Sequence, residues 1–313
     1  MTKIKIITHN GGFHADDVFA VATIKLWLEK TNPPGLFFKN EIEVIRTRNP
    51  EVIAKGDFVV DLGGGYQPTK KIFDHHQKGG AGERANGIPY SSFGLVWKEY
   101  GEILCDSPAG AEVLDRRLVQ PIDAVDNGID LCNLIYPDVS PYLISDLVGA
   151  YNFVNKNNKE KSLDDCFLRA VEWAGEVLEK EIGAIKKERK EWQLIEKIYQ
   201  TTDDKRLIVL NQELSDRGEE ILVDYPEPLF VVKPNTSNGN WKVKTVKKSV
   251  ASFVSRRDLP ESWAGKTGEE LAKITGIAGA IFCHNKRFIV VANTKEEAVK
   301  LAELALETER STS

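Results

Sequence analysis

Short β-branched runs alternate with helix-like segments over the first hundred residues, and this alternation restricts the fold more than any other feature. The strand-like runs are "KIKIIT", "EIEVIRTR", "DFVVDLGGG" and "KKIFDHHQ", at 3–8, 41–48, 57–65 and 70–77. Between the first two runs, residues 16–30 carry apolar side chains around most of a helix, which predicts a well-buried helix. Asn49 followed by Pro50 predicts the capped start of a short helix. Strands that alternate with helices indicate an α/β layer with a mostly parallel sheet.

Two further helices are expected before the middle of the chain. Ser91 or Ser92 is placed to open the first of them, and Gly101 to stop it. Residues 108–126 form the second. The glycine-rich segment 79–87, which lies ahead of both, is either a mobile loop over a site or a plain connector.

A long amphipathic stretch then separates two parts of different character. Its apolar positions, spaced four or three apart, are Leu163, Phe167, Val171, Ala174, Leu178, Ile182 and Ile185. This spacing predicts one apolar stripe along a helix, and the charged run 186–191 fits its solvated face. From about residue 205, short strands with hairpin-like turns predict a smaller α+β domain. We therefore expect an α/β domain over 1–155, a helical linker over 156–204 and an α+β domain over 205–313.

Composition narrows the class of protein. With 313 residues, 42% hydrophobic and 28% charged, the chain can bury two cores and does not resemble a disordered protein. The formal net charge of −5 gives no support for a polyanion-coating protein. The four cysteines lack zinc or redox spacing, no apolar run reaches membrane-spanning length, and the first residues resemble no signal peptide. We expect a cytoplasmic protein with reduced cysteines and no membrane partner.

Histidines and aspartates gather where the predicted strands end. The residues that follow the first strand or end the third and fourth are His9, His14, Asp16, Asp17, Asp61, Asp74, His75 and His76. Because ligands bind at the carboxyl ends of parallel strands, these side chains should meet at one edge of the sheet. Asp123 and Asp126 stand three residues apart at a helix end, so both could face the same edge. Each residue alone fits a turn or a cap, but their joint placement predicts a metal site.

Mixed imidazole and carboxylate ligands suit Mn²⁺, Mg²⁺, Fe²⁺ or Zn²⁺. The set is large enough for two ions, and Asp61 at the end of a central strand could bridge them. Two ions about 3.5–4 Å apart activate a water molecule and clamp a phosphoryl group during in-line displacement. The pattern therefore favours phosphoester hydrolysis.

Ordered sequence blocks along nearly the whole chain resemble one superfamily. "THNGGFHADDVFA", "VVDLGGGY", "IFDHHQKG", "SSFGLVWKEYG" and "IDAVDNGID" resemble the motifs of the DHH phosphoesterases. They are most similar to the melanocyte-proliferating-gene branch, as is "RRDLPESWAGKTGEELAKITGIAGAIFCHNKRF" in the second half. The resemblance implies a DHH-type catalytic domain, a substrate-binding second domain and a metal-dependent phosphoesterase. Known members of the branch are described as 3′→5′ exoribonucleases.

The resemblance also assigns roles to residues. Asp61 would bridge two divalent cations, Mn²⁺ first and Mg²⁺ second, while His76 would face the substrate and Asp74 would orient the neighbouring histidine. The implied metal ligands are His9, His14, Asp16, Asp61 and His75, with Asp126 or Asp123 completing the second ion. The superfamily motif His-x-x-x-Asp-x-Asp is one residue longer here and has His14 in place of its first aspartate.

Substrate contacts are expected mainly from the second domain. Arg256 and His284 match the pattern of the branch, although His284 fits a plain strand end equally well. Arg48, or Arg46 two residues before it, could hold a phosphate or simply be exposed on a strand. RNA or a short oligonucleotide is the expected substrate, and pyrophosphate or a dinucleotide is the alternative. A metal-dependent binding module without catalysis, and a homodimer formed through the long helix, also stay open.

Overall fold

The computed structural model describes residues 3–32, 42–154, 162–250 and 252–308. The chain divides into two compact units, Met1–Lys186 and Lys187–Ser313, and the division falls inside the long helix α7 (Leu163–Thr201). Residues 156–161 of the predicted linker lie outside the described residues. This division lies inside the linker that we predict over 156–204. The exact domain limits stay a prediction.

The sheet of the first unit is mostly parallel, as the sequence predicts. Its strands are β1 (Ile4–Thr8), β2 (Ile42–Arg46), β3 (Phe58–Val60), β4 (Tyr66–Gln67) and β5 (Ile72–Phe73). They lie in the order β2-β1-β3-β5-β4, and only β4 runs antiparallel to its neighbour. The carboxyl ends of β1, β3 and β5 therefore share one edge.

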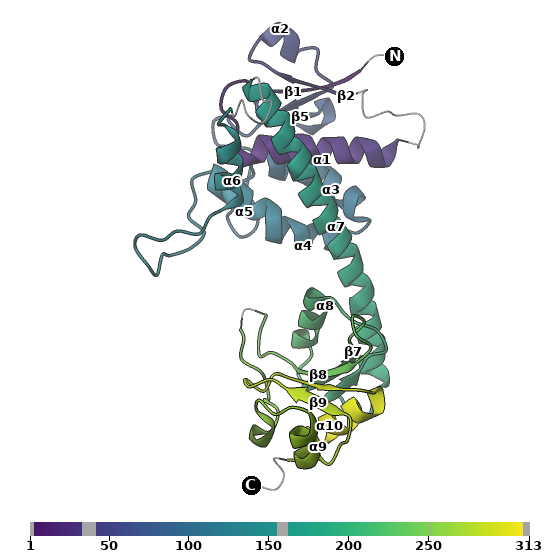
Figure 1. Cartoon of the computed structure of the whole chain (residues 1–313). Helices are drawn as coiled ribbons and strands as arrows, with labels where there is room; N and C mark the ends of the chain where they lie inside the picture. Colours follow the sequence, from purple (N-terminus) through teal and green to yellow (C-terminus); the bar gives the residue numbers. More distant parts are fainter. Residues whose placement is uncertain (1–2, 33–41, 155–161, 251, 309–313) are drawn as a thin grey trace. The chain divides into compact units, whose positions relative to one another are not determined.

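Side chains alternate between the two faces of this sheet. Ile6, Phe58 and Val60 point into the large core beneath α1 (Ala15–Thr31), α3 (Ser92–Cys105) and α7. Ile7 and Val59 point the other way, toward α2 (Pro50–Ile53). Helices thus cover both faces, as Figure 1 shows for the first unit. The apolar stripe of α7 lies within the core of this unit, from Phe167 to Ile185, while a homodimer stays a prediction.

The prediction that Gly101 stops its helix is wrong, because α3 continues to Cys105. Gly101 is there for packing, since a Cβ at this position would lie 2.6 Å from the Trp97 ring. The helix ends instead at Asp106, whose backbone takes the left-handed conformation with φ 54°. Ser91 occupies the predicted position just before the helix.

The helix predicted over 108–126 is present in three sections. They are α4 (Pro108–Leu114), a π-helical turn (Asp115–Val119) and α5 (Gln120–Asp126). A long exposed connection leads from there to α6 (Ile144–Tyr151). The π turn lies directly before α5, the section that carries Asp123 and Asp126.

The second unit is an α+β fold, as the sequence predicts. Its strands are β6 (Leu207–Val209), β7 (Phe230–Pro234), β8 (Trp241–Thr245), β9 (Ala280–Cys283) and β10 (Ile289–Ala292). They lie in the order β6-β7-β8-β10-β9, and only β6 and β7 are parallel. The accompanying helices are the end of α7, α8 (Asp216–Glu220), α9 (Gly268–Thr275) and α10 (Lys295–Glu307).

Candidate metal centre

The loop between β1 and α1, together with the first turn of α1, brings three candidate ligands to the sheet edge: His9, His14 and Asp16. The amide of Asn152 fixes this loop, because its Oδ1 accepts from Phe13 N at 3.0 Å and its Nδ2 donates to Phe13 O at 2.8 Å. His14 takes the N-cap position of α1, and its backbone N donates to Asp17 Oδ1 at 3.0 Å. The first turn of α1 therefore buries Asp16 and Asp17 beneath the loop.

Asp61 follows β3 directly and has an unusual backbone. Its φ is 57°, the left-handed region that aspartate tolerates better than most residues. Its backbone N donates to Phe73 O at 2.9 Å, which ties the end of β3 to β5. The turn directs the Asp61 carboxylate inward from the sheet edge, where it is almost fully buried.

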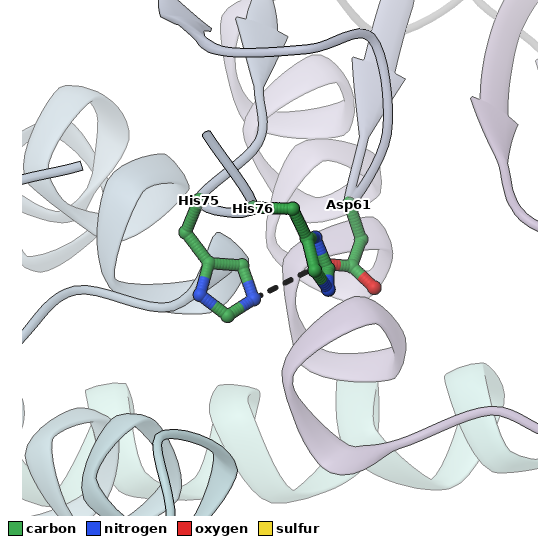
Figure 2. A group of neighbouring side chains, drawn as sticks. All are labelled: Asp61, His75 and His76. Atoms are coloured by element: carbon green, nitrogen blue, oxygen red, sulfur yellow. Dashed lines mark ion pairs between the residues drawn. The ribbon is translucent and has the colours of Figure 1, made fainter. Parts of the chain in front are cut away.

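The two oxygens of Asp61 face two different histidines. Oδ2 lies 3.2 Å from His9 Nε2, and Oδ1 lies 3.3 Å from His75 Nε2. Figure 2 shows Asp61 and the two adjacent histidines, His75 and His76, converging on one space. A carboxylate with one oxygen toward each of two imidazoles has the arrangement that a bridging ligand requires.

A second group adjoins the first. His14, Asp16 and Asp126 each offer one ligand atom, and these atoms lie within 4.8 Å of one another. His75 links the groups, because its Nε2 lies 3.2 Å from Asp126 Oδ2 and 3.8 Å from Asp16 Oδ2. The structure thus brings together the predicted ligands His9, His14, Asp16, Asp61, His75 and Asp126.

Asp123 is not among the residues that meet there. Its Oδ1 accepts from Ser91 Oγ at 2.5 Å and from Gly94 N at 3.0 Å, while its Oδ2 lies 2.8 Å from Arg84 Nη1. Arg84 comes from the glycine-rich segment 79–87 and also holds Asp115 through two nitrogens. Asp123 therefore belongs to a buried network beside the candidate ligands, and Arg84 fastens its segment to that network.

Asp74 and His76 form a pair at the open side of the group. Asp74 Oδ2 accepts from Gly64 N at 2.7 Å, and its Oδ1 lies 2.9 Å from His76 Nδ1. The His76 side chain is 63% exposed. The hydrogen bond at Nδ1 fixes the ring and leaves Nε2 as the nitrogen that an incoming molecule can reach.

Sequence reasoning missed one supporting residue, Ser92, whereas Asp17 was among the residues expected at this edge. Ser92, in the first turn of α3, donates from Oγ to Asp61 Oδ1 at 2.8 Å and from its backbone N to Asp16 Oδ2 at 3.3 Å. Asp17 Oδ2 lies 3.4 Å from His9 Nε2. The signal for Ser92 was present in the sequence, because a helix N-terminus attracts negative charge and a helix start was expected there.

The residues of the group fit divalent cations. Asp16 Oδ1 is buried and accepts no hydrogen bond from any residue that the structure describes. Buried carboxylate oxygens without partners are costly unless an ion or water satisfies them. Together with imidazole nitrogens, they make a donor set for Mn²⁺, Mg²⁺ or a similar ion.

Charge repulsion and burial alter the titration of the group. Burial raises the pKa of Asp16 well above its usual value, and the carboxylates of Asp61 and Asp126 raise it further. Burial also raises the pKa of Asp17 to about 7, although nearby His9 opposes the shift. A hydrogen bond with Asp61 raises the pKa of His9. Without cations, the group therefore keeps protons that ordinary carboxylates and imidazoles would lose.

Comparison with known proteins assigns the chain to a family. The profile of the MYG1 exonuclease family, described as "Uncharacterised protein family (UPF0160)", matches residues 5–306. This chain belongs to the MYG1 family. It is 30% identical to a MYG1 protein of Dictyostelium discoideum, over 96% of both chains. It is 29% identical to the MYG1 exonuclease of Homo sapiens, over 98% of this chain and 86% of the human one.

The family assignment confirms the resemblance to the melanocyte-proliferating-gene branch. One solved structure, RecJ of Thermus thermophilus in complex with Mn²⁺, is also similar. It shares 11% identity at a TM-score of 0.24, with 98% of this chain and 52% of that chain covered. The candidate site of the MYG1-family chain is therefore described from its own contacts and distances.

The predicted substrate residues of this MYG1-family chain come from both units, and in the first unit Arg46 donates from Nη2 to Gly11 O, in the loop that carries His9 and His14. In the first unit, Arg48 is exposed beyond β2, and Arg46 pairs with Asp164 at 2.8 Å. In the second unit, the guanidinium of Arg256 donates to three backbone carbonyls. The His284 ring is partly exposed, with its centre 4.3 Å from that of Phe288. Arg256 thus has a structural task, and the substrate roles of these residues stay predictions.

Within the described ranges, no helix is both long and apolar enough to cross a membrane.

Proposed function

We propose that this chain is a divalent-metal-dependent phosphoesterase that removes nucleotides from the 3′ end of RNA or short oligonucleotides. The human relative bears the name MYG1 exonuclease, which supports an exonuclease within the same family. The ligand set at the sheet edge supports metal-dependent hydrolysis. We also propose that it works in the cytoplasm, in keeping with its four free cysteines.

The position of Asp61 carries the proposal. Since Oδ2 faces His9 and Oδ1 faces His75, each side of the carboxylate offers one oxygen and one imidazole. We infer two cations, most suitably Mn²⁺, which Asp61, His9 and His75 would help to hold. The remaining ligands would be His14, Asp16 and Asp126. Paired cations lower the pKa of water and stabilise the charge that builds up on a phosphoryl group.

The protein's own residues would do the positioning. Ser92 holds the carboxylates of Asp61 and Asp16 through its hydroxyl and amide, so the ligands are fixed before substrate arrives. His76 would contact a phosphate oxygen or the leaving oxygen through Nε2. Asp74 orients that ring, and Gly64 N in turn holds Asp74.

The test uses purified full-length protein stripped of metal and then supplied with Mn²⁺, Mg²⁺ or no cation. Labelled RNA and DNA oligomers of the same sequence, a dinucleotide and pyrophosphate are offered separately. We expect Mn²⁺ to restore stepwise shortening of RNA, with nucleoside monophosphates as products. Hydrolysis of pyrophosphate alone would replace the proposal with a small-substrate phosphatase.

Metal content must be measured in the same samples. Asp61→Asn should lose activity, and Glu112→Gln, at an exposed surface pair with Arg116, should retain it. Stoichiometric metal without turnover on any of the four substrates would make the chain a binding module. Full activity in metal-loaded Asp61→Asn would show that the sheet edge is not the catalytic site.

A further inference from the structure

A pocket of about 300 Å³ opens directly beside two candidate ligands. Three elements of the first unit form its wall: the start of α1, the end of α5 and helix α6. The lining residues that matter here are Phe13, His14, Asp126, Ser145, Gly149 and Asn152. This volume is near the lower limit for small-molecule sites, so the pocket suits one small ligand rather than a stretch of polymer.

The lining of the pocket has little charge away from the ligands. Val125 supplies apolar surface, Ser145 supplies a hydroxyl, and no lysine or arginine lines the pocket. Asn152 is rigidly placed, because both ends of its amide pair with the backbone of Phe13. Such a wall accepts an uncharged group that can form hydrogen bonds, and it offers no lysine or arginine for a second phosphate.

The pocket shares His14 and Asp126 with the candidate metal centre. A phosphate placed at that centre would therefore direct one of its ester substituents into the pocket. We propose that the pocket binds the terminal nucleoside of the substrate while the adjacent phosphate lies at the metal centre. This inference rests on the proposed function and specifies which substrate class it serves: nucleoside phosphates rather than pyrophosphate.

Gly149 gives direct experimental access to the pocket. It lies inside α6, its φ is outside the left-handed region, and a Cβ there would meet no atom within 4 Å. A larger side chain can therefore enter the pocket without displacing the backbone. It should also favour the helix, since glycine is a poor helix former.

The binding experiment is isothermal titration calorimetry of Mn²⁺-loaded protein with adenosine 5′-monophosphate and, separately, inorganic phosphate. We expect Gly149→Leu to weaken nucleotide binding about 10-fold or more, a change of about 1.4 kcal/mol, and to leave phosphate binding unchanged. Gly183→Leu is the matched control. Gly183 also lies within a helix, α7, with no atom within 4 Å of its Cβ, but it does not line the pocket.

A second variant guards against a folding defect. Circular dichroism reports whether Gly149→Leu is folded, and if it is not, Gly149→Ala takes its place with a smaller expected loss, about threefold. Equal loss of nucleotide and phosphate, or nucleotide affinity equal to that of Gly183→Leu, would overturn the proposal. If the wild-type protein binds nucleotide without hydrolysing any substrate, and Gly149→Leu abolishes that binding, the pocket is upheld and the proposed function is refuted. If Gly149→Leu hydrolyses oligonucleotides with an unchanged KM, the proposed function is upheld and the pocket is refuted.

Discussion

Oδ1 of Asp61 lies 3.3 Å from Nε2 of His75, across the ends of two neighbouring parallel strands. This contact depends on the left-handed backbone of Asp61, which costs about 1–2 kcal/mol for a residue with a side chain. Hydrogen bonds from His75, His9 and Ser92 outweigh burial and lower the pKa of Asp61. The central ligand is therefore ionised while its carboxylate neighbours tend to hold protons.

Replacing Asp61 with asparagine removes the negative charge of the side chain but preserves the backbone conformation. Asp61→Asn keeps a residue that tolerates φ 57°, so we expect a folded protein. It removes the charge shared by His9 and His75, so turnover should fall by more than the roughly 100-fold typical of a residue behind the ligands. Activity and bound metal are measured together. If both stay at the wild-type level, Asp61 is not a ligand.

His76 should act on the substrate rather than on metal content. We expect His76→Ala to lower kcat by about 10²–10⁴-fold, the range for a positioned acid or base, with little change in bound metal. The measurement pairs single-turnover kinetics with metal analysis. Asp74→Ala should lower kcat in the same way because it frees the His76 ring. It should also destabilise the fold by about 1–3 kcal/mol, since Gly64 N loses its acceptor. Equal loss of metal and kcat in His76→Ala would instead make His76 a ligand.

The metal-free protein should become less stable as pH rises. Asp16, Asp17 and Asp126 have raised pKa values in the folded state, chiefly through burial. The folded chain therefore binds more protons than the unfolded one, and this stability is lost from about pH 4 to about pH 7. His9 and His75 also have raised pKa values and add a loss as pH rises beyond 6.5. Asp61, with its lowered pKa, opposes this trend only below pH 3.8.

Urea unfolding at several pH values, with and without Mn²⁺, measures this trend. Because metal binding displaces the retained protons, stabilisation by Mn²⁺ should increase from about pH 5 to about pH 8. Asp17→Asn should flatten the slope for the metal-free protein, since it removes a carboxyl whose pKa is about 7. If the metal-free protein instead becomes more stable over this pH range, the carboxyls of Asp16, Asp17 and Asp126 do not retain protons in the folded state.

Measurements of stability and of kinetics together can assign a role to Arg256. Its guanidinium donates to the carbonyls of Val223, Tyr225 and Pro228, so Arg256→Ala should destabilise the second unit by about 1–3 kcal/mol. If the contacts are only structural, kcat and KM measured well below the unfolding transition should not change. A raised KM for RNA with unchanged stability would instead establish the predicted substrate role.

Sequence patterns could predict the sheet edge because it depends on local signals. Asp61 and His75 each follow a short β-rich run, and parallel strands bring such positions together. The choice between Asp126 and Asp123 could not be made in this way. It depends on Arg84, which binds Asp123 from about forty residues earlier in the chain.

Packing and distant hydrogen bonds limited the other predictions. Gly101 has the sequence signature of a helix stop, yet the ring of Trp97, one helical turn earlier, packs against it. The sequence places the two residues four apart but does not show which way the ring turns. Arg256 fits a family pattern, but its partners are carbonyls of residues 223, 225 and 228. Backbone acceptors have no sequence signature, so side-chain chemistry alone could not identify them.

Arg84 should be far more important for stability than a surface arginine. Its side chain is 7% exposed and pairs with Asp115 and with fully buried Asp123. Arg84→Ala leaves the Asp123 charge buried without its partner, so we expect a loss of about 3–5 kcal/mol in urea unfolding. The control is Arg116→Ala, which breaks an exposed pair with Glu112 and should cost about 0–1 kcal/mol. Adding Asp123→Asn to Arg84→Ala should recover part of the loss, because it removes the unpaired charge. Equal costs for the two arginines would show that the network does not hold α5, and with it Asp126, in place.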